Sequence, residues 1–294
     1  MTFCEPEAEL VGDAKAQSSG IASSASLRFV RRSARAGLGS FARRSRKHFS
    51  SRSREAWRGL RSRDFLEMDD FTSPSRLTQN GIRYVAPPSP NAGYFWVADA
   101  KDPRIQIVHE GTVGHYGQLC ASWQNPNPIR RHYYDSGANE GIGFYSEEMM
   151  LQSGLYDDSP HSREIVYNQM RLRALRVIAD VKLALGTFAP TQAADFLERN
   201  VPMSTEDART EVVEMGETPG QKISYQIGKL QIIQMLEGAR QKQGEQFSLR
   251  KFHDYLWLNG NVPIALLRWE YLGMDDEVIK PMKGVARNIL EGSG

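Results

Sequence analysis

Apolar residues recur at helical spacing through most of the chain after residue 103. The longest stripe belongs to a helix that we expect to begin near Pro160, where spacings of 7, 3, 4 and 4 residues keep one face apolar. Its members are Ile165, Leu172, Leu175, Ala179 and Leu183. Periodicity and capping residues predict further helices over residues 108–123, 139–154, 191–199, 204–215, 219–241, 248–258 and 263–272. The sequence therefore predicts a mainly α protein.

Two short runs favour β structure before the first of these helices. Residues 82–85 and 94–98 are rich in aromatic and β-branched side chains, and the turn-forming PPSPNAG lies between them. We expect a short β hairpin or an edge strand here, and an edge strand could pair with an extended peptide.

The basic N-terminal segment differs in composition from the rest. Residues 28–63 carry 13 arginines and lysines against one acid, Glu55, and show no sustained hydrophobic periodicity. We predict that residues 1–66 are disordered and that residues 67–294 form the folded domain. The segment could be a solvated tail, an organelle-targeting segment or a nucleic-acid-binding arm, the last being unlikely because few aromatics interleave. The expected location is cytoplasmic or organellar.

Composition narrows the function further. No apolar run approaches the roughly 20 residues that span a bilayer, and the mean hydropathy is −0.50, so we predict no membrane span. The two cysteines, Cys4 and Cys120, lie far apart and give no disulfide framework. A bound metal would therefore be held by nitrogen and oxygen.

A histidine-rich segment supplies such ligands. His109 and His115 flank Glu110, and catalytic zinc sites combine imidazoles with a carboxylate that can take a proton from the attacking water. Histidines six residues apart lie about 240° around a straight helix and could not chelate one ion. We therefore expect a π-bulge or a break, which Gly111 and Gly114 would permit.

The next predicted helix offers a third ligand. Glu140 is the candidate, and Glu147 lies seven residues later on nearly the same face, where it could accept a hydrogen bond from a ligand histidine. The alternative is a solvated acidic face. The apolar and small residues between the two carboxylates favour a buried helix, in which both would need partners.

Several ordered blocks carry a family resemblance over roughly residues 94–272. HEGTVGH resembles an H-E-x-x-P-G-H block with Val113 in place of proline, and EGIGFYSE resembles E-G-W-A-L-Y-A-E. Arg173, Ala174, Arg176 and Asp180 fit R-A-x-R-x-x-x-D, PGQKISYQIG fits P-G-Q-x-x-S-Y-x-I-G, and Phe252, His253 and Asp254 fit F-H-D. Together these blocks resemble the domain of unknown function 885 (DUF885) family, whose members look like zincin-type metallopeptidases.

The resemblance implies a zincin-like helical catalytic domain that binds Zn²⁺. Its ligands would be His109, His115 and Glu140, with Glu110 as general base and Tyr225 and His253 as donors to the developing oxyanion. Second-shell or substrate-binding roles would fall to Glu147, Arg173, Arg176, Asp180 and Gln221. Structural alternatives remain: Tyr225 could bond a backbone acceptor, His253 could pack on a helix, and the arginines could pair with Asp180 or Glu147.

The expected function is zinc-dependent hydrolysis of a peptide or related amide bond. The resemblance also implies a helical region before the H-E block, where this chain has its basic segment, so we interpret the chain as the catalytic half. The expected partners are the peptide or amide substrate and a second copy in a homodimer. The alternatives are a non-catalytic helical scaffold and a nucleic-acid-associated protein acting through residues 28–63.

Overall fold

The computed structural model describes residues 92–111 and 113–279, and this part of the chain is almost entirely helical. The predicted boundary at residue 66 and the predicted strand at residues 82–85 lie outside it. In chain order the elements are α3 (Tyr94–Lys101), α4 (Arg104–Glu110), α5 (His115–Ser122), α6 (Pro128–His132), α7 (Ser136–Gln152), α8 (Pro160–Ala184), α9 (Pro190–Asn200), α10 (Thr205–Glu217), α11 (Gln221–Gln243), the 3-10 helix η2 (Gly244–Gln246), α12 (Leu249–Leu258) and α13 (Ile264–Leu272). The mainly α prediction is confirmed.

The predicted strand at residues 94–98 is wrong, because this run forms the first part of helix α3. Aromatic and β-branched residues favour strands only where a pleated surface is there to pack on. Here Tyr94 and Phe95 instead pack against an apolar cluster of other helices, and Asp207 Oδ1 accepts the Tyr94 N–H at 3.1 Å. Within the described ranges, β pairing is limited to one isolated bridge, Tyr134 to Asn261. The described residues form no β hairpin, and their architecture gives no support for a zincin-like fold.

Helix α8 begins where its sequence predicts, at Pro160. Pro160 occupies the first turn, where its missing N–H costs nothing, and the Ser159 side chain caps the helix by accepting the Ser162 N–H. Gly186 follows the last turn with a φ of +68°, a left-handed conformation that favours glycine. The 25-residue helix is long enough to contact both halves of the molecule.

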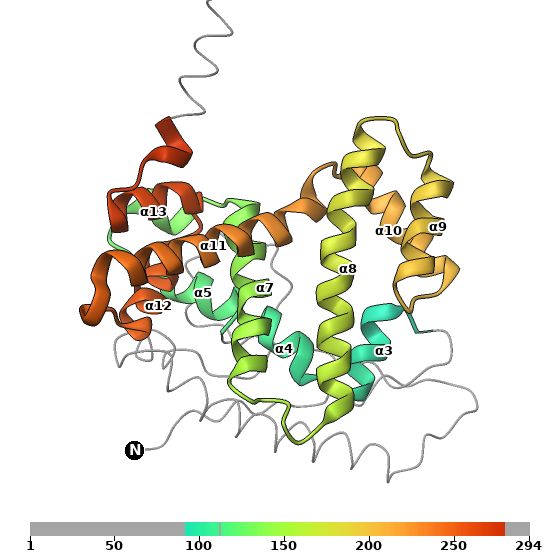
Figure 1. Cartoon of the computed structure of the whole chain (residues 1–294), viewed down its shortest axis with the longest axis horizontal. Helices are drawn as coiled ribbons and strands as arrows, with labels where there is room; N and C mark the ends of the chain where they lie inside the picture. The colour runs from blue at the N-terminus through green and yellow to red at the C-terminus, as the bar shows by residue number, and fades with distance from the viewer. Residues whose placement is uncertain (1–91, 112, 280–294) are drawn as a thin grey trace, which may run out of the picture.

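Two apolar clusters make up the core, and α8 joins them. Figure 1 shows α8 between α7 and α11 on one side and α9 and α10 on the other. Val166, near the start of α8, is buried in the larger cluster with Phe252 and Trp257 of α12. Leu172 and Ala179 are buried in the smaller cluster formed with α9 and α10. The predicted stripe thus exists, but its first member, Ile165, packs against the larger cluster instead.

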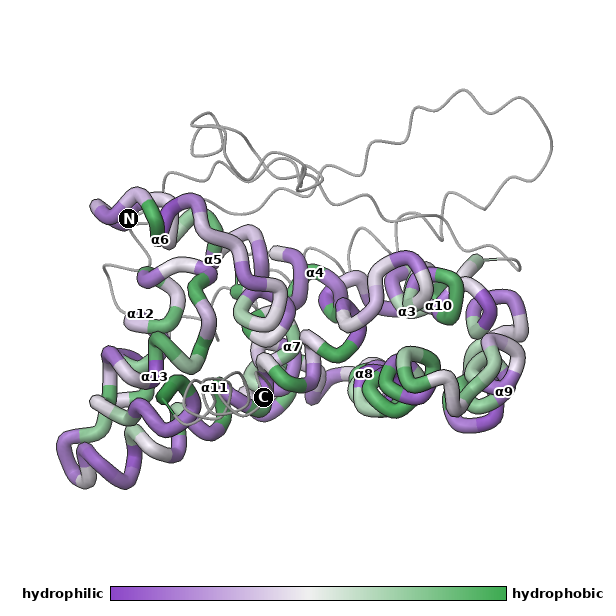
Figure 2. Tube along the Cα trace, turned by 90° about the horizontal axis from the view of Figure 1, so that it is seen from above, coloured by the Kyte–Doolittle hydropathy of each residue, from purple (hydrophilic) through white to green (hydrophobic). Residues whose placement is uncertain are grey.

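A glycine contact sets the crossing of α7 and α11, which is visible in Figure 1. A Cβ atom on Gly228 would lie 1.8 Å from the Gly137 carbonyl oxygen and 2.8 Å from the Gly141 Cα, so a larger residue would force the helices apart. The close approach brings the first turns of α11 beside α7. Figure 2, seen from above, shows α11 beside α7, with α4 on the same side of α8 as α7 and α3 next to α10.

The structure contains no membrane-spanning candidate among the helices between residues 92 and 279. The absence of a long apolar helix agrees with the prediction for this part of the chain.

Candidate metal centre

A break in the chain between α4 and α5 separates the two histidines. A break was one of the two distortions that we expected. The Gly117 N–H donates across the break to the Gly111 carbonyl at 3.0 Å. The Val113 carbonyl accepts from Ser146 Oγ at 2.9 Å and from Trp257 Nε1 at 3.0 Å. A Cβ on Gly114 would lie 1.7 Å from the His109 carbonyl oxygen, so glycine is required there. The break directs both imidazoles toward α7.

The three side chains that we predicted as ligands come together where α4 and α5 meet α7. Glu140 Oε2 lies 3.3 Å from Nε2 of His109 and 3.3 Å from Nε2 of His115. The three candidate donor atoms lie within 4.8 Å of one another, and all three residues are buried. Gly143 leaves room for the two rings, since a Cβ there would lie 2.7 Å from His109 Nε2 and 2.8 Å from His115 Cε1.

A second carboxylate fixes the orientation of His109. Glu147 Oε1 lies 2.6 Å from His109 Nδ1, and Glu147 is fully buried. Arg173 Nη2 donates to the same oxygen at 2.7 Å. In the neutral ring Nδ1–H donates to Glu147, and the Nε2 lone pair is then available to an ion beside Glu140. The predicted hydrogen bond between Glu147 and a ligand histidine is present.

The charges of this cluster are strongly coupled. Burial lowers the pKa of His109, but the hydrogen bonds to Glu140 and Glu147 outweigh it and raise that pKa to about 9. Burial raises the pKa of Glu140, and its two histidine partners more than compensate, so that its pKa falls far below the usual range. The buried carboxylates of the cluster therefore favour a positive charge beside them. Two imidazole nitrogens and one carboxylate oxygen are a donor set that fits zinc.

The start of α11 contributes two more predicted residues. The Tyr225 ring stacks 5.9 Å from the His109 ring, measured between centroids. Burial, followed by the charge of Glu140, raises the pKa of the Tyr225 phenol far above its usual range, so the hydroxyl keeps its proton. Gln221 Nε2 donates to Glu140 Oε1 at 3.2 Å, and Ser136 Oγ donates to Gln221 Oε1 at 2.6 Å. Gln221 thus holds the carboxylate oxygen that does not face the histidines.

A cavity of about 460 Å³ opens beside the cluster. This volume lies within the range of small-molecule sites. Its walls come from five helices, α3, α4, α8, α10 and α11, and Glu110 lines it next to His109. Its lining also includes Gln106, Arg173, Arg176, Asp207, Glu211, Glu214, Lys222 and Tyr225.

Arg173, Arg176 and Asp180 each have a different bonding partner in the structure. Arg173 pairs with Glu147, one of the two predicted partners. Arg176 instead makes a double hydrogen bond to Glu211 of α10 through Nε and Nη2, and its Nε contact measures 2.6 Å. Asp180 accepts the Gly220 N–H at 3.1 Å and so fixes the turn before α11. Asp180 therefore contacts α11 rather than either arginine.

Sequence reasoning missed the acidic and basic side chains of α10 and α11 in this wall. Glu211 pairs with Arg176, and Lys222 forms an ion pair with Glu214. A signal for Glu211 was present: it stands 3 residues after Ala208 and 4 before Met215, on the buried face of α10. A buried carboxylate at that spacing calls for a cationic partner.

His253 is not brought to the cavity wall. It is fully buried on α12, with Nε2 2.9 Å from the Tyr145 hydroxyl. Its ring also lies 5.8 Å from that of Trp257, whose indole N–H holds Val113 in the break. Through Trp257, His253 therefore helps to hold the segment between His109 and His115.

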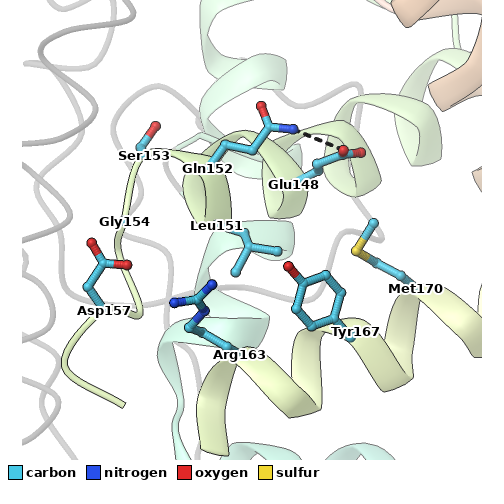
Figure 3. A pocket seen from close by; sticks show the side chains of 9 residues that line it. All are labelled: Glu148, Leu151, Gln152, Ser153, Gly154, Asp157, Arg163, Tyr167 and Met170. Atoms are coloured by element: carbon cyan, nitrogen blue, oxygen red, sulfur yellow. Dashed lines mark hydrogen bonds between the residues drawn. The ribbon is translucent and has the colours of Figure 1, made fainter. Parts of the chain in front are cut away.

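A second hollow, shown in Figure 3, lies between the end of α7 and the start of α8 and has a volume of about 400 Å³. Arg163 and Tyr167 of α8 face Leu151 of α7 across it. Two of its polar side chains bond to each other, since Gln152 Nε2 donates to Glu148 at 3.0 Å. It brings together no set of candidate metal donors.

The fold and the site together define a mainly helical protein with a buried cluster of two histidines and one glutamate. A family model described as "Bacterial protein of unknown function (DUF885)" matches residues 33–270, and the chain belongs to this family. The matched range begins inside the basic segment. No curated protein gives a significant match.

Two solved structures are similar to the chain. The crystal structure of the putative lipoprotein from Colwellia psychrerythraea is 28% identical, with a TM-score of 0.54 over 56% of this chain and 28% of that one. The structure of a putative lipoprotein of unknown function from Shewanella oneidensis is 19% identical, with a TM-score of 0.66 over 86% of this chain and 46% of that one. The chain spans less than half the length of either relative.

Proposed function

We propose that this chain carries the metal-binding catalytic site of a zinc-dependent hydrolase that cleaves peptide or related amide bonds. The observation that supports it most is the position of Glu140 Oε2, 3.3 Å from both imidazole Nε2 atoms, while Glu147 holds His109 Nδ1 at 2.6 Å. A ligand set with an oriented imidazole is typical of zinc sites with catalytic function. The zincin-like relationship belongs to this proposal.

When bound, zinc would supply Lewis acidity, which polarises a carbonyl and makes water more acidic. The residues of the chain supply the remaining functions. Glu110, in the cavity wall beside His109, takes a proton from the attacking water and passes it to the leaving nitrogen. The Tyr225 hydroxyl, which keeps its proton, donates a hydrogen bond to the oxyanion.

The structure removes one of the sequence-based arguments for a peptide substrate. An edge strand at residues 94–98 cannot pair with a peptide, because these residues are helical. The cavity of about 460 Å³ is instead large enough for a short segment of a substrate. The homodimer, the role of residues 28–63 and the cytoplasmic or organellar location stay predictions.

The first test is the metal content of the purified full-length chain, measured by elemental mass spectrometry. We expect about one zinc per chain, and its loss in a His109→Ala, His115→Ala double variant whose helical content by circular dichroism is unchanged. Hydrolysis of a peptide pool should then be lost in Glu110→Gln while zinc is retained. Folded wild-type protein that binds no zinc would overturn the proposal, and zinc without hydrolysis would favour the scaffold.

A further inference from the structure

Two side chains in the cavity wall bury hydrogen-bond donors that have no partner in the described part of the chain. They are Nε2 of Gln106 and both Nε and Nη1 of Arg173. Gln106 is 5% exposed and Arg173 is 3% exposed, and both line the cavity that holds His109. A buried donor without a partner destabilises the fold because it has lost its hydrogen bonds to water. Both residues line one cavity from two helices, α4 and α8, and a ligand bound there would supply the missing acceptors.

The guanidinium of Arg173 is held in place by its other contacts. Its Cζ lies 5.0 Å from the centroid of the Phe144 ring and 5.6 Å from that of the Tyr225 ring. Nη2 is fixed by its bond to Glu147. The two rings and the carboxylate restrict rotation, so the remaining N–H groups keep a constant direction. A planar, preorganised group of this kind is suited to binding a carboxylate.

Three other charged residues of the wall, Arg176, Lys222 and Asp207, already have partners. Arg176 uses both Nε and Nη2 on Glu211, and Lys222 binds Glu214. Asp207 Oδ1 accepts the Tyr94 N–H. These carboxylates are therefore committed to neighbouring helices. Arg176 has the same chemistry as Arg173 in the same wall, but its fork is occupied.

The position of the two donors relative to the metal ligands defines what they would bind. Gln106 precedes His109 by one turn of α4. Arg173 bonds Glu147, which bonds His109. We propose that Gln106 and Arg173 bind the terminal carboxylate of the substrate, so that the site acts on peptides with a free carboxyl end, close to that end. This inference rests on the proposed hydrolase function and names its substrate class.

Binding without turnover tests it directly. Isothermal titration of the zinc-supplemented full-length Glu110→Gln protein would compare N-acetyl-Ala-Ala with its carboxyl-terminal amide. We expect the free acid to bind about tenfold more tightly or better, the effect of a hydrogen bond to a charged group. Adding Gln106→Glu should abolish the preference by placing a like charge there, and adding Gln106→Leu should reduce it. Gln234→Glu, an equal charge change at an exposed position of α11, should leave it intact.

Each outcome decides the question. Equal affinities for acid and amide, no binding of either peptide, or a preference that survives both Gln106 substitutions would overturn the proposal. Thermal melting identifies variants that fail to fold, and the leucine variant retains size without charge. Hydrolysis of amidated peptides by wild type at undiminished rate would overturn this inference but leave the hydrolase function standing. Acid-selective binding without any hydrolysis would overturn the hydrolase function but leave the carboxylate-binding role of Gln106 and Arg173 standing.

Discussion

Nδ1 of His109 lies 2.6 Å from Oε1 of Glu147, although 38 residues separate them in the chain. The contact fixes which imidazole nitrogen carries the proton and which one faces Glu140. It depends on the break after α4, on the buried face of α7 and on Arg173, which donates to the same carboxylate oxygen.

Glu147→Gln tests this contact. An amide keeps the size of the side chain but removes the charge that holds the His109 proton, and loss of such a support typically costs 10–100-fold in metal affinity. We expect zinc affinity, measured by competition with a chromophoric chelator, to fall by about that factor. Glu164→Gln, on the exposed surface of α8, is the control. An unchanged affinity in Glu147→Gln would show that the carboxylate does not orient the ligand.

Gly143→Ala tests the room left for the imidazoles. The new methyl group would lie 2.7 Å from His109 Nε2 and 2.8 Å from His115 Cε1, so one ring must move. We expect loss of stoichiometric zinc, with helical content preserved. Gly216→Ala in α10 meets no atom within 4 Å and should stabilise the protein by roughly 0.5–1 kcal/mol. Melting curves and zinc content of both variants provide the comparison, and full zinc binding by Gly143→Ala would contradict the geometry.

Tyr225→Phe separates catalysis from metal binding. The ring and its stacking on His109 remain, but the hydroxyl that keeps its proton is removed. Loss of one oxyanion donor typically lowers kcat by about 10²–10³-fold. We expect a decrease of that size on a cleaved peptide, with zinc content unchanged. Tyr167→Phe, on the exposed face of α8, is the matched control, and equal kcat values for the two variants would exclude the role.

Zinc binding should release protons near neutral pH. In the metal-free protein the pKa of His109 is raised to about 9, so the ring is protonated at pH 7.5, whereas a metal ligand must be neutral. Apparent zinc affinity should therefore rise with pH up to about 9. The opposite sign holds for the metal-free fold, because protonated His109 stabilises it below its unfolded pKa, and this stabilisation is lost as pH rises through 9. Calorimetry in buffers of different ionisation enthalpy measures the released proton, and a buffer-independent heat would contradict the prediction.

The helices and the clustering of the candidate ligands could be predicted because their signals are local. The spacing of 7 residues between Glu140 and Glu147 defines one helix face, and the glycines between His109 and His115 indicate the break. Residues 94–98 illustrate the limit: their composition favours a strand, and only contacts with α10 and its neighbours, more than 100 residues later, make them a helix.

Other parts of the site depend on pairings that no local pattern contains. Arg176 meets Glu211 because α10 folds back beside α8, and the sequence alone left Asp180 or Glu147 as its predicted partner. Gln106 was overlooked for a similar reason. A lone glutamine in an apolar stretch becomes notable only when its amide is found buried in the wall of the cavity.

The segment between the histidines departs from the resembled pattern at Val113, where that pattern has proline. Its loop is held through the Val113 carbonyl, which accepts hydrogen bonds from Ser146 and Trp257, while the side chain packs in the apolar core. Proline keeps this carbonyl and an apolar ring, so both interactions are open to either residue. At the neighbouring Gly114 a Cβ would lie 1.7 Å from the His109 carbonyl oxygen. The loop is therefore specified by its main chain and not by the chemistry of its side chains.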